Sequence, residues 1–92
     1  MTYELFVWLK PDLSSDQVKK EVKDMEEFIK DVKKLQSENL GRKKLAYKIK
    51  GFEEGIQLGI KLECNPERIS DLSIYLNRDD SVLRYLITKN EK

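Results

Sequence analysis

The chain has 92 residues, with 18 Lys plus Arg, 17 Asp plus Glu and no His, so its formal net charge at pH 7 is +1. This balance argues against a polycationic protein that coats nucleic acid over its whole surface. The length predicts a single domain, residues 1–92, with one modest hydrophobic core.

The residue types that are missing exclude several kinds of site. Cys64 is the only cysteine, so an intramolecular disulfide and a four-cysteine zinc site are excluded, and without His there is no imidazole ligand or base. No apolar run approaches the roughly 20 residues that cross a bilayer. The N-terminus has Glu4 where a signal peptide would have Lys or Arg. We therefore expect a protein of a reducing compartment, cytoplasmic or organellar, with no membrane contact, metal or cofactor.

The first segment, Thr2–Lys10, alternates with a period of two, which predicts a strand. One face of this strand would carry Tyr3, Leu5, Val7 and Leu9, and the other Glu4, Phe6 and Trp8.

A helix is predicted after Pro11 ends that strand. Ser14 and Gln17 have the spacing of a capping box, and Leu13 with Val18 that of a hydrophobic staple. Apolar residues then recur at helical spacing, which predicts a helix from about Ser15 to about Leu35. The apolar stripe comprises Val18, Val22, Met25, Ile29, Val32 and Leu35.

Two strands joined by a hairpin are predicted in the middle of the chain. Residues 36–41 are interpreted as a polar connection, followed by a strand in which Leu45, Tyr47 and Ile49 alternate with lysines. Gly51–Gly55 is interpreted as the hairpin loop, and Ile56–Cys64 as the next strand, with Cys64 a core residue.

The last third predicts a helix and a final strand. Asn65 would cap a helix that has Pro66 at its first position and ends before residues 77–80. The buried stripe of that helix would be Ile69, Leu72 and Leu76. Val82–Thr88 is predicted to be a strand. The order βαββαβ predicts an α+β, ferredoxin-like fold: a four-stranded antiparallel sheet with two helices on one face and an open second face.

No catalytic site is predicted. The adjacent acids, such as Glu26-Glu27 and Glu53-Glu54, would point apart into solvent, and Cys64 lacks a base that could activate it. The glycines of Gly51–Gly59 lack the ending of a phosphate loop. We therefore expect a protein that is not an enzyme.

Basic residues gather between Gly41 and Gly51, where there is no acid: Arg42, Lys43, Lys44, Lys48 and Lys50. This segment could neutralise RNA phosphates, or its lysines could simply protect an edge strand from aggregation, and the residues alone leave both interpretations open. Arg84 and Lys89 of the last strand add further candidates for RNA binding.

The open sheet face presents Phe6 and Trp8 on the first strand, and Leu86 with Val82 beside Arg84 on the last. Exposed aromatic rings indicate a protein-docking surface or a platform for base stacking, unless a loop or lysine stems cover them. An RNA-recognition motif is excluded because the strand Ile56–Cys64 has no outward aromatic residue.

Three segments carry a more specific signal: Tyr3–Pro11, Leu40–Ile49 (LGRKKLAYKI) and Asn77–Leu86 (NRDDSVLRYL). They closely resemble the bacterial family of small-subunit ribosomal protein six. The resemblance implies a ferredoxin-like, non-enzymatic protein of the small ribosomal subunit. It also implies binding to the central domain of the small-subunit rRNA, in a heterodimer with small-subunit ribosomal protein eighteen.

The same resemblance implies roles for particular residues. The RNA contacts would be the family's basic cluster, Arg42, Lys43 and Lys44, and the arginine of its final strand, Arg84. Together with the residue pattern this gives RNA-binding candidates Arg42, Lys43, Lys44, Lys48, Lys50, Arg84 and Lys89, and protein-partner candidates Phe6, Trp8, Tyr47 and Leu86. No small-molecule substrate is implied. The alternative is a ferredoxin-like regulatory or protein-interaction module that acts as a homodimer, because this fold has many functions.

Overall fold

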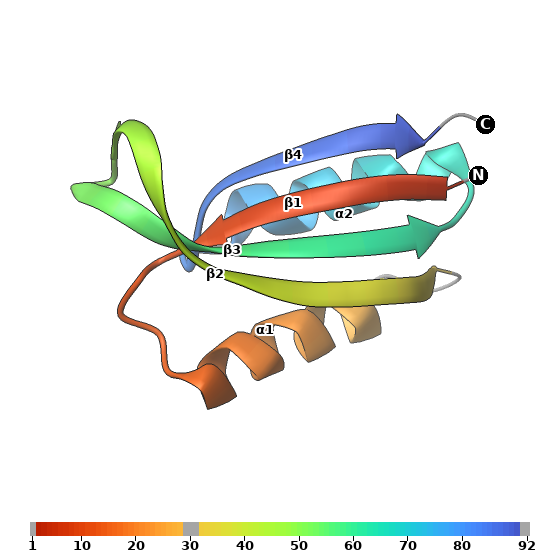
Figure 1. Cartoon of the computed structure of the whole chain (residues 1–92). Helices are drawn as coiled ribbons and strands as arrows, with labels where there is room; N and C mark the ends of the chain where they lie inside the picture. The colour runs from red at the N-terminus through yellow and green to blue at the C-terminus, as the bar shows by residue number, and fades with distance from the viewer. Residues whose placement is uncertain (1, 29–31, 91–92) are drawn as a thin grey trace.

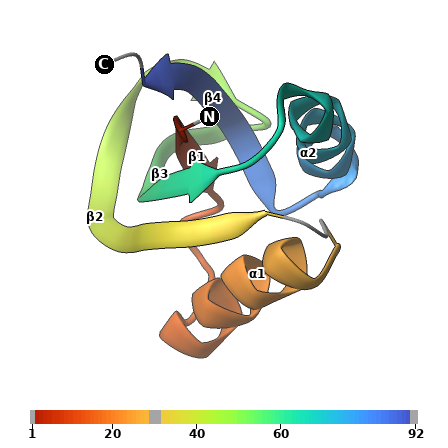
Figure 2. The same ribbon diagram turned by 90° about the vertical axis from the view of Figure 1, so that its right-hand side faces the viewer.

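The structure is a computed structural model that describes residues 2–28 and 32–90. Its elements, in chain order, are β1 (Thr2–Leu9), α1 (Ser15–Phe28), β2 (Lys33–Ile49), β3 (Phe52–Glu63), α2 (Pro66–Arg78) and β4 (Val82–Asn90). The strands form one antiparallel sheet in the order β2-β3-β1-β4 (Figure 1). Both helices lie on one side of this sheet, and the other side is open (Figure 2). The predicted ferredoxin-like fold is confirmed.

The core lies between the sheet and the helices. The predicted inward faces of β1 and β3 are confirmed, since alternate residues of both strands are buried, and each helix contributes an apolar stripe to the same cluster. The principal members are Leu5, Val7, Leu9, Val18, Met25, Ile56, Leu58, Ile60, Leu62, Leu72 and Leu76.

Helix α1 begins as predicted but ends earlier. The Ser14 backbone N–H donates to Gln17 Oε1 at 2.8 Å, and the Gln17 N–H donates to Ser14 Oγ at 3.2 Å, which completes the capping box. The predicted extension to Leu35 is wrong, because α1 is described only to Phe28 and Leu35 lies exposed in β2. The predicted stripe position Ile29 lies outside the described residues.

Strand β2 is much longer than predicted. The expected polar connection at residues 36–41 is wrong, because these residues pair with β3, for example Gln36 with Lys61 and Glu38 with Gly59. Nearly all side chains of β2 are exposed on both faces, and its first half, residues 33–41, has no apolar alternation from which a strand could be predicted. Near its start, Lys34 Nζ lies 2.6 Å from Glu26 Oε1, which joins β2 to α1.

Strands β2 and β3 are connected by a tight turn at Lys50-Gly51. These two residues have φ values of 51° and 86°, the left-handed pair of a two-residue hairpin. The predicted loop Gly51–Gly55 is wrong, since β3 begins at Phe52. Between the pairs Lys44/Glu54 and Ile49/Phe52, residues 45–48 of β2 face only Glu53 of β3. We call residues 42–54 the hairpin arm; it extends beyond the ends of β1 and β4 (Figure 1).

The last two elements agree with prediction, with small corrections. Asn65 occupies the N-cap of α2, but its side chain makes no capping hydrogen bond, and the helix continues to Arg78. Val82 is buried in the core instead of sharing the open face with Leu86. The reason is an irregularity in pairing: Trp8 is opposite Arg84, whereas Leu9 is opposite Val82, which leaves Leu83 as an extra residue.

Candidate RNA and protein-partner interface

Clusters of metal ligands and membrane-spanning helices are absent from the described part of the chain. No group of three His, Cys, Asp or Glu residues within residues 2–28 and 32–90 could hold a metal ion, and no helix there is long and apolar enough to span a membrane. Cys64 is buried, and burial raises the pKa of its thiol, which disfavours the reactive thiolate.

The hairpin arm places the predicted basic cluster at one end of the sheet. Arg42 Nη1 donates to Glu54 Oε1 at 3.1 Å, and Arg42 Nη2 donates to the Pro11 carbonyl, also at 3.1 Å. These two bonds fix the base of the arm against the end of β1. The Arg42 side chain is nevertheless 64% exposed, so its guanidinium remains accessible to solvent.

The lysines of the arm point to both of its faces. Lys44 lies opposite Glu54 and so shares the helix-side face with Arg42, whereas Lys43 lies opposite Gly55 on the open-face side. Lys48 and Tyr47 are exposed in the irregular segment, where Tyr47 has 64% of its surface in solvent. Lys50 Nζ donates to the Val82 carbonyl at 3.2 Å, which ties the tip of the arm to the start of β4.

The two predicted basic residues of β4 are far apart. The Arg84 guanidinium lies 5.7 Å from the centre of the Trp8 ring, a cation–π contact on the open face near the arm. Lys89 instead pairs with Tyr3, at the other end of β1. The structure therefore brings Arg84, but not Lys89, towards the basic residues of the arm.

An apolar row crosses the open face perpendicular to the strands. Phe6 lies opposite Leu86 of β4 on one side and opposite Gly59 of β3 on the other. Leu40 of β2 completes the row, since its Cδ1 is 3.5 Å from the position that a Cβ on Gly59 would occupy. Leu86 is 44% exposed and Phe6 is half-buried. Of the predicted partner residues, Phe6, Trp8 and Leu86 thus share this face, whereas Tyr47 lies on the arm.

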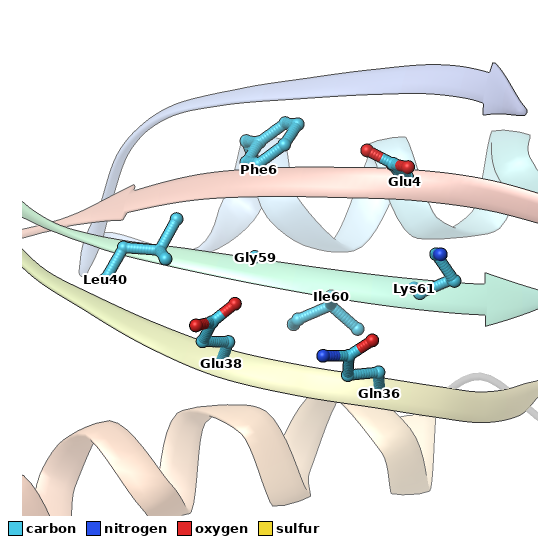
Figure 3. A pocket seen from close by; sticks show the side chains of 8 residues that line it. All are labelled: Glu4, Phe6, Gln36, Glu38, Leu40, Gly59, Ile60 and Lys61. Atoms are coloured by element: carbon cyan, nitrogen blue, oxygen red, sulfur yellow. The ribbon is translucent and has the colours of Figure 1, made fainter.

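A hollow of about 210 Å³ opens within the row, above Gly59 (Figure 3). Its lining is apolar at Phe6, Leu40, Gly59 and Ile60 and polar at Glu4, Gln36, Glu38 and Lys61. Sequence reasoning missed Leu40 and Gly59 as site residues. The available signal was a glycine at an outward position of a strand, which often marks the close approach of another molecule.

Comparisons with known proteins show the family to which the chain belongs. A sequence model described as Ribosomal protein S6 matches residues 2–89. The chain belongs to this family. The small ribosomal subunit protein bS6 of Rippkaea orientalis is 33% identical over 98% of this chain and 74% of its own length. The corresponding protein of Campylobacter jejuni is 34% identical over 97% of this chain and 73% of its own. The crystal structure of 30S ribosomal protein S6 from Thermotoga maritima matches with a TM-score of 0.86 at 22% identity, covering 97% of this chain and 86% of that one. This match supports the ferredoxin-like fold.

Membership of the ribosomal protein S6 family tests the predictions of activity and location. The family is a structural component of the small ribosomal subunit, so the predicted absence of enzymatic activity is confirmed, as are the ribosomal location and the role in translation. One relative is the plastid-type bS6c of Cyanidioschyzon merolae, which is 30% identical over 95% of this chain and 88% of its own length. This relative is consistent with the prediction that the ribosome could also be an organellar one.

Proposed function

We propose that this chain binds the central domain of the small-subunit rRNA through its hairpin arm, and small-subunit ribosomal protein eighteen through its open sheet face. The observation that supports the RNA-binding part most directly is the charge of the arm. It contains five basic residues against two acids, Glu53 and Glu54, which gives a local charge of +3 on a projecting two-stranded ribbon. A projecting basic ribbon brings its cations to phosphates without requiring the rest of the surface to be basic.

Arg42 can exchange its carboxylate partner, Glu54, for phosphate at little cost. Its ion pair with Glu54 is formed by two exposed side chains, 64% and 48% in solvent, and such pairs contribute at most about 1 kcal/mol. A guanidinium binds phosphate through two parallel hydrogen bonds, whereas lysines act as point charges. The arm therefore combines one directional contact, at Arg42, with point charges at Lys43, Lys44 and Lys48.

The open face supports the protein-binding part of the proposal. The apolar row is bordered on one side by the Trp8–Arg84 pair and on the other by the polar rim of the hollow. An apolar centre with a polar surround is the usual anatomy of a protein interface. Trp8 belongs to a residue type that is enriched among residues important for binding, and Arg84 beside it stays a candidate for RNA binding.

The RNA contact is tested by neutralising two lysines of the arm and measuring the affinity for a central-domain rRNA fragment across a salt series. Each lost phosphate contact lowers the salt slope by about 0.7 to 0.9, so Lys43→Gln with Lys44→Gln should lower it by about 1.4 to 1.8. The matched control is Lys19→Gln with Lys23→Gln, which removes the same charge from exposed positions on α1. Equal slopes in the two double variants would contradict the proposal, as would a wild-type chain that forms a homodimer and binds neither the RNA nor protein eighteen.

A further inference from the structure

The hollow above Gly59 is the most specific feature of the open face. We propose that it receives one apolar side chain from a basic segment of the protein partner, so that Gly59 and the carboxylates of Glu4 and Glu38 select that segment. This inference rests on the proposed function and names the chemistry by which the open face would recognise its partner.

The size of the hollow indicates a side chain as its occupant. Its volume of about 210 Å³ is below the roughly 300–1,000 Å³ typical of small-molecule sites, yet it far exceeds the roughly 10–15 Å³ that one water molecule needs. Phe6 and Leu40 form its apolar wall (Figure 3). One inserted aliphatic or aromatic side chain would contact both of these residues and displace the water.

The absence of a side chain at Gly59 creates the hollow. Its φ is not positive, since the glycines with positive φ are Gly41 and Gly51, so the backbone here does not require glycine. A Cβ at this position would meet Leu40 Cδ1 and Phe6 Cε1 at 3.5 Å each, which is ordinary contact. A glycine in a central strand has no side chain to pack and weakens the strand. Access to the sheet surface is thus what this glycine provides.

The charges of the rim indicate a basic occupant. Glu4, Glu38 and Gln36 surround the apolar wall together with a single cation, Lys61. Within residues 2–28 and 32–90, neither carboxylate forms an ion pair or a side-chain hydrogen bond. A lysine or arginine next to the inserted apolar side chain would pair with them. A nucleotide is disfavoured here because its phosphate would meet two carboxylates against one ammonium group.

The test measures binding of recombinant protein eighteen by titration calorimetry. Gly59→Val places a branched side chain in the hollow and should weaken binding by about tenfold or more. Gly59→Ala fills it partly, folds without strain because its Cβ makes only ordinary contacts, and should weaken binding by a smaller factor. The control Thr2→Val introduces the same side chain on the same face, at the far end of β1 and outside the lining of the hollow, and should change binding much less.

A second pair of variants tests the charges. Glu4→Gln and Glu38→Gln should each weaken binding to protein eighteen and reduce its dependence on salt, because each removes an attraction to a cation. Affinity of the chain alone for the rRNA fragment should not fall in any of these variants.

The outcomes separate this inference from the proposed function. If the wild-type chain binds protein eighteen and both Gly59 variants bind equally well, the inference is wrong and the proposed function stands. If the wild type does not bind protein eighteen at all, the proposed partner is wrong and the inference falls with it. If Gly59→Val weakens RNA binding instead, a nucleotide occupies the hollow, which overturns the inference.

Discussion

Two glycines of β3 have opposite reasons for lacking a side chain. Gly55 is buried, and a Cβ there would lie 2.9 Å from the Leu9 carbonyl oxygen and 3.3 Å from Leu83 Cδ1. We predict that Gly55→Ala destabilises the fold by about 1–3 kcal/mol, because backbone must move to accept the methyl group. Gly59→Ala should be neutral or slightly stabilising, since its Cβ would make only ordinary contacts with Leu40 and Phe6. Urea unfolding of both variants measures this difference, and equal destabilisation would show that Gly59 is also packed tightly.

Glu21 makes stability depend on pH in the direction opposite to a salt-bridged acid. Burial on α1 raises the pKa of Glu21 from 4.5 to about 7, and the neighbouring Asp79 contributes in the same direction. A raised pKa means that the folded state favours the protonated form. The contribution of protonated Glu21 to the stability of the folded state is therefore complete below pH 4.5, and it is lost as the pH rises through about 7. Burial also raises the pKa of Tyr75 to about 12, so this neighbour stays neutral over that range.

We predict that the melting temperature of the wild type falls between about pH 5 and about pH 8 more than that of Glu21→Gln. Glutamine keeps a hydrogen-bonding side chain of similar shape and cannot ionise. Calorimetric melts in buffers of matched ionic strength give the comparison. Asp16→Asn is the control, because Asp16 is an exposed acid of the same helix. Parallel pH profiles for wild type and Glu21→Gln would contradict this account.

Among the elements, α1 depends on its first turn. Its capping box satisfies two backbone N–H groups, those of Ser14 and Gln17. We predict that Ser14→Ala lowers the free energy of unfolding by about 1 kcal/mol. Ser15→Ala, one residue later and inside the helix, should have little effect because alanine is a good helix former. The two variants are compared by chemical denaturation, and a similar loss in both would mean that the cap does not stabilise the helix.

The boundary between α1 and β2 was poorly predicted for a physical reason. Val32 and Leu35 continue the three- and four-residue spacing of the helix, so the pattern favours helix through a segment that pairs as a strand from Lys33. The pairing of β2 with β3 supplies backbone hydrogen bonds that no side-chain pattern reports, since β2 has both faces exposed. By contrast, β1 and the second half of β3, from Ile56 onwards, were predicted as strands because one face of each is buried, whereas Phe52–Gly55 of β3 was predicted as a loop.

The candidate site also has one part that could be predicted from the sequence and one part that could not. The basic residues of the arm were identifiable because they are adjacent in sequence and free of intervening acid. The hollow was not, because Leu40 of β2 and Gly59 of β3 meet only through a register that contains a bulge between Asn39 and Gly41. Leu40 lay in a segment interpreted as a connection, which has no predicted face. Pairing register, and not composition, brings these two residues together.

At the scale of the whole molecule, the net charge of +1 conceals a separation of charge. The hairpin arm carries +3, so the rest of the chain carries −2, and two of its acids border the hollow on the open face. The arm attracts a polyanion, whereas the rim of the hollow attracts a cation. The fold therefore holds two surfaces of opposite preference next to each other, which suits simultaneous contact with RNA and with a basic protein.

This arrangement predicts that the two binding activities are separable by mutation and coupled in the assembly. Lys43→Gln with Lys44→Gln should weaken binding to the rRNA fragment and leave the affinity for protein eighteen unchanged, and Gly59→Val should do the reverse. When all three components are present, protein eighteen should raise the RNA affinity of the wild-type chain. RNA should raise its affinity for protein eighteen by the same factor, because coupling between two sites is reciprocal.

Gly59→Val should also lower the amount of ternary complex at fixed concentrations of the three components. The reason is that less protein eighteen is bound to the variant, so less of the variant gains the higher RNA affinity. Calorimetry of the binary and ternary steps measures each factor, and a Gly59→Val chain that loses RNA affinity without protein eighteen would show that the two surfaces are one site.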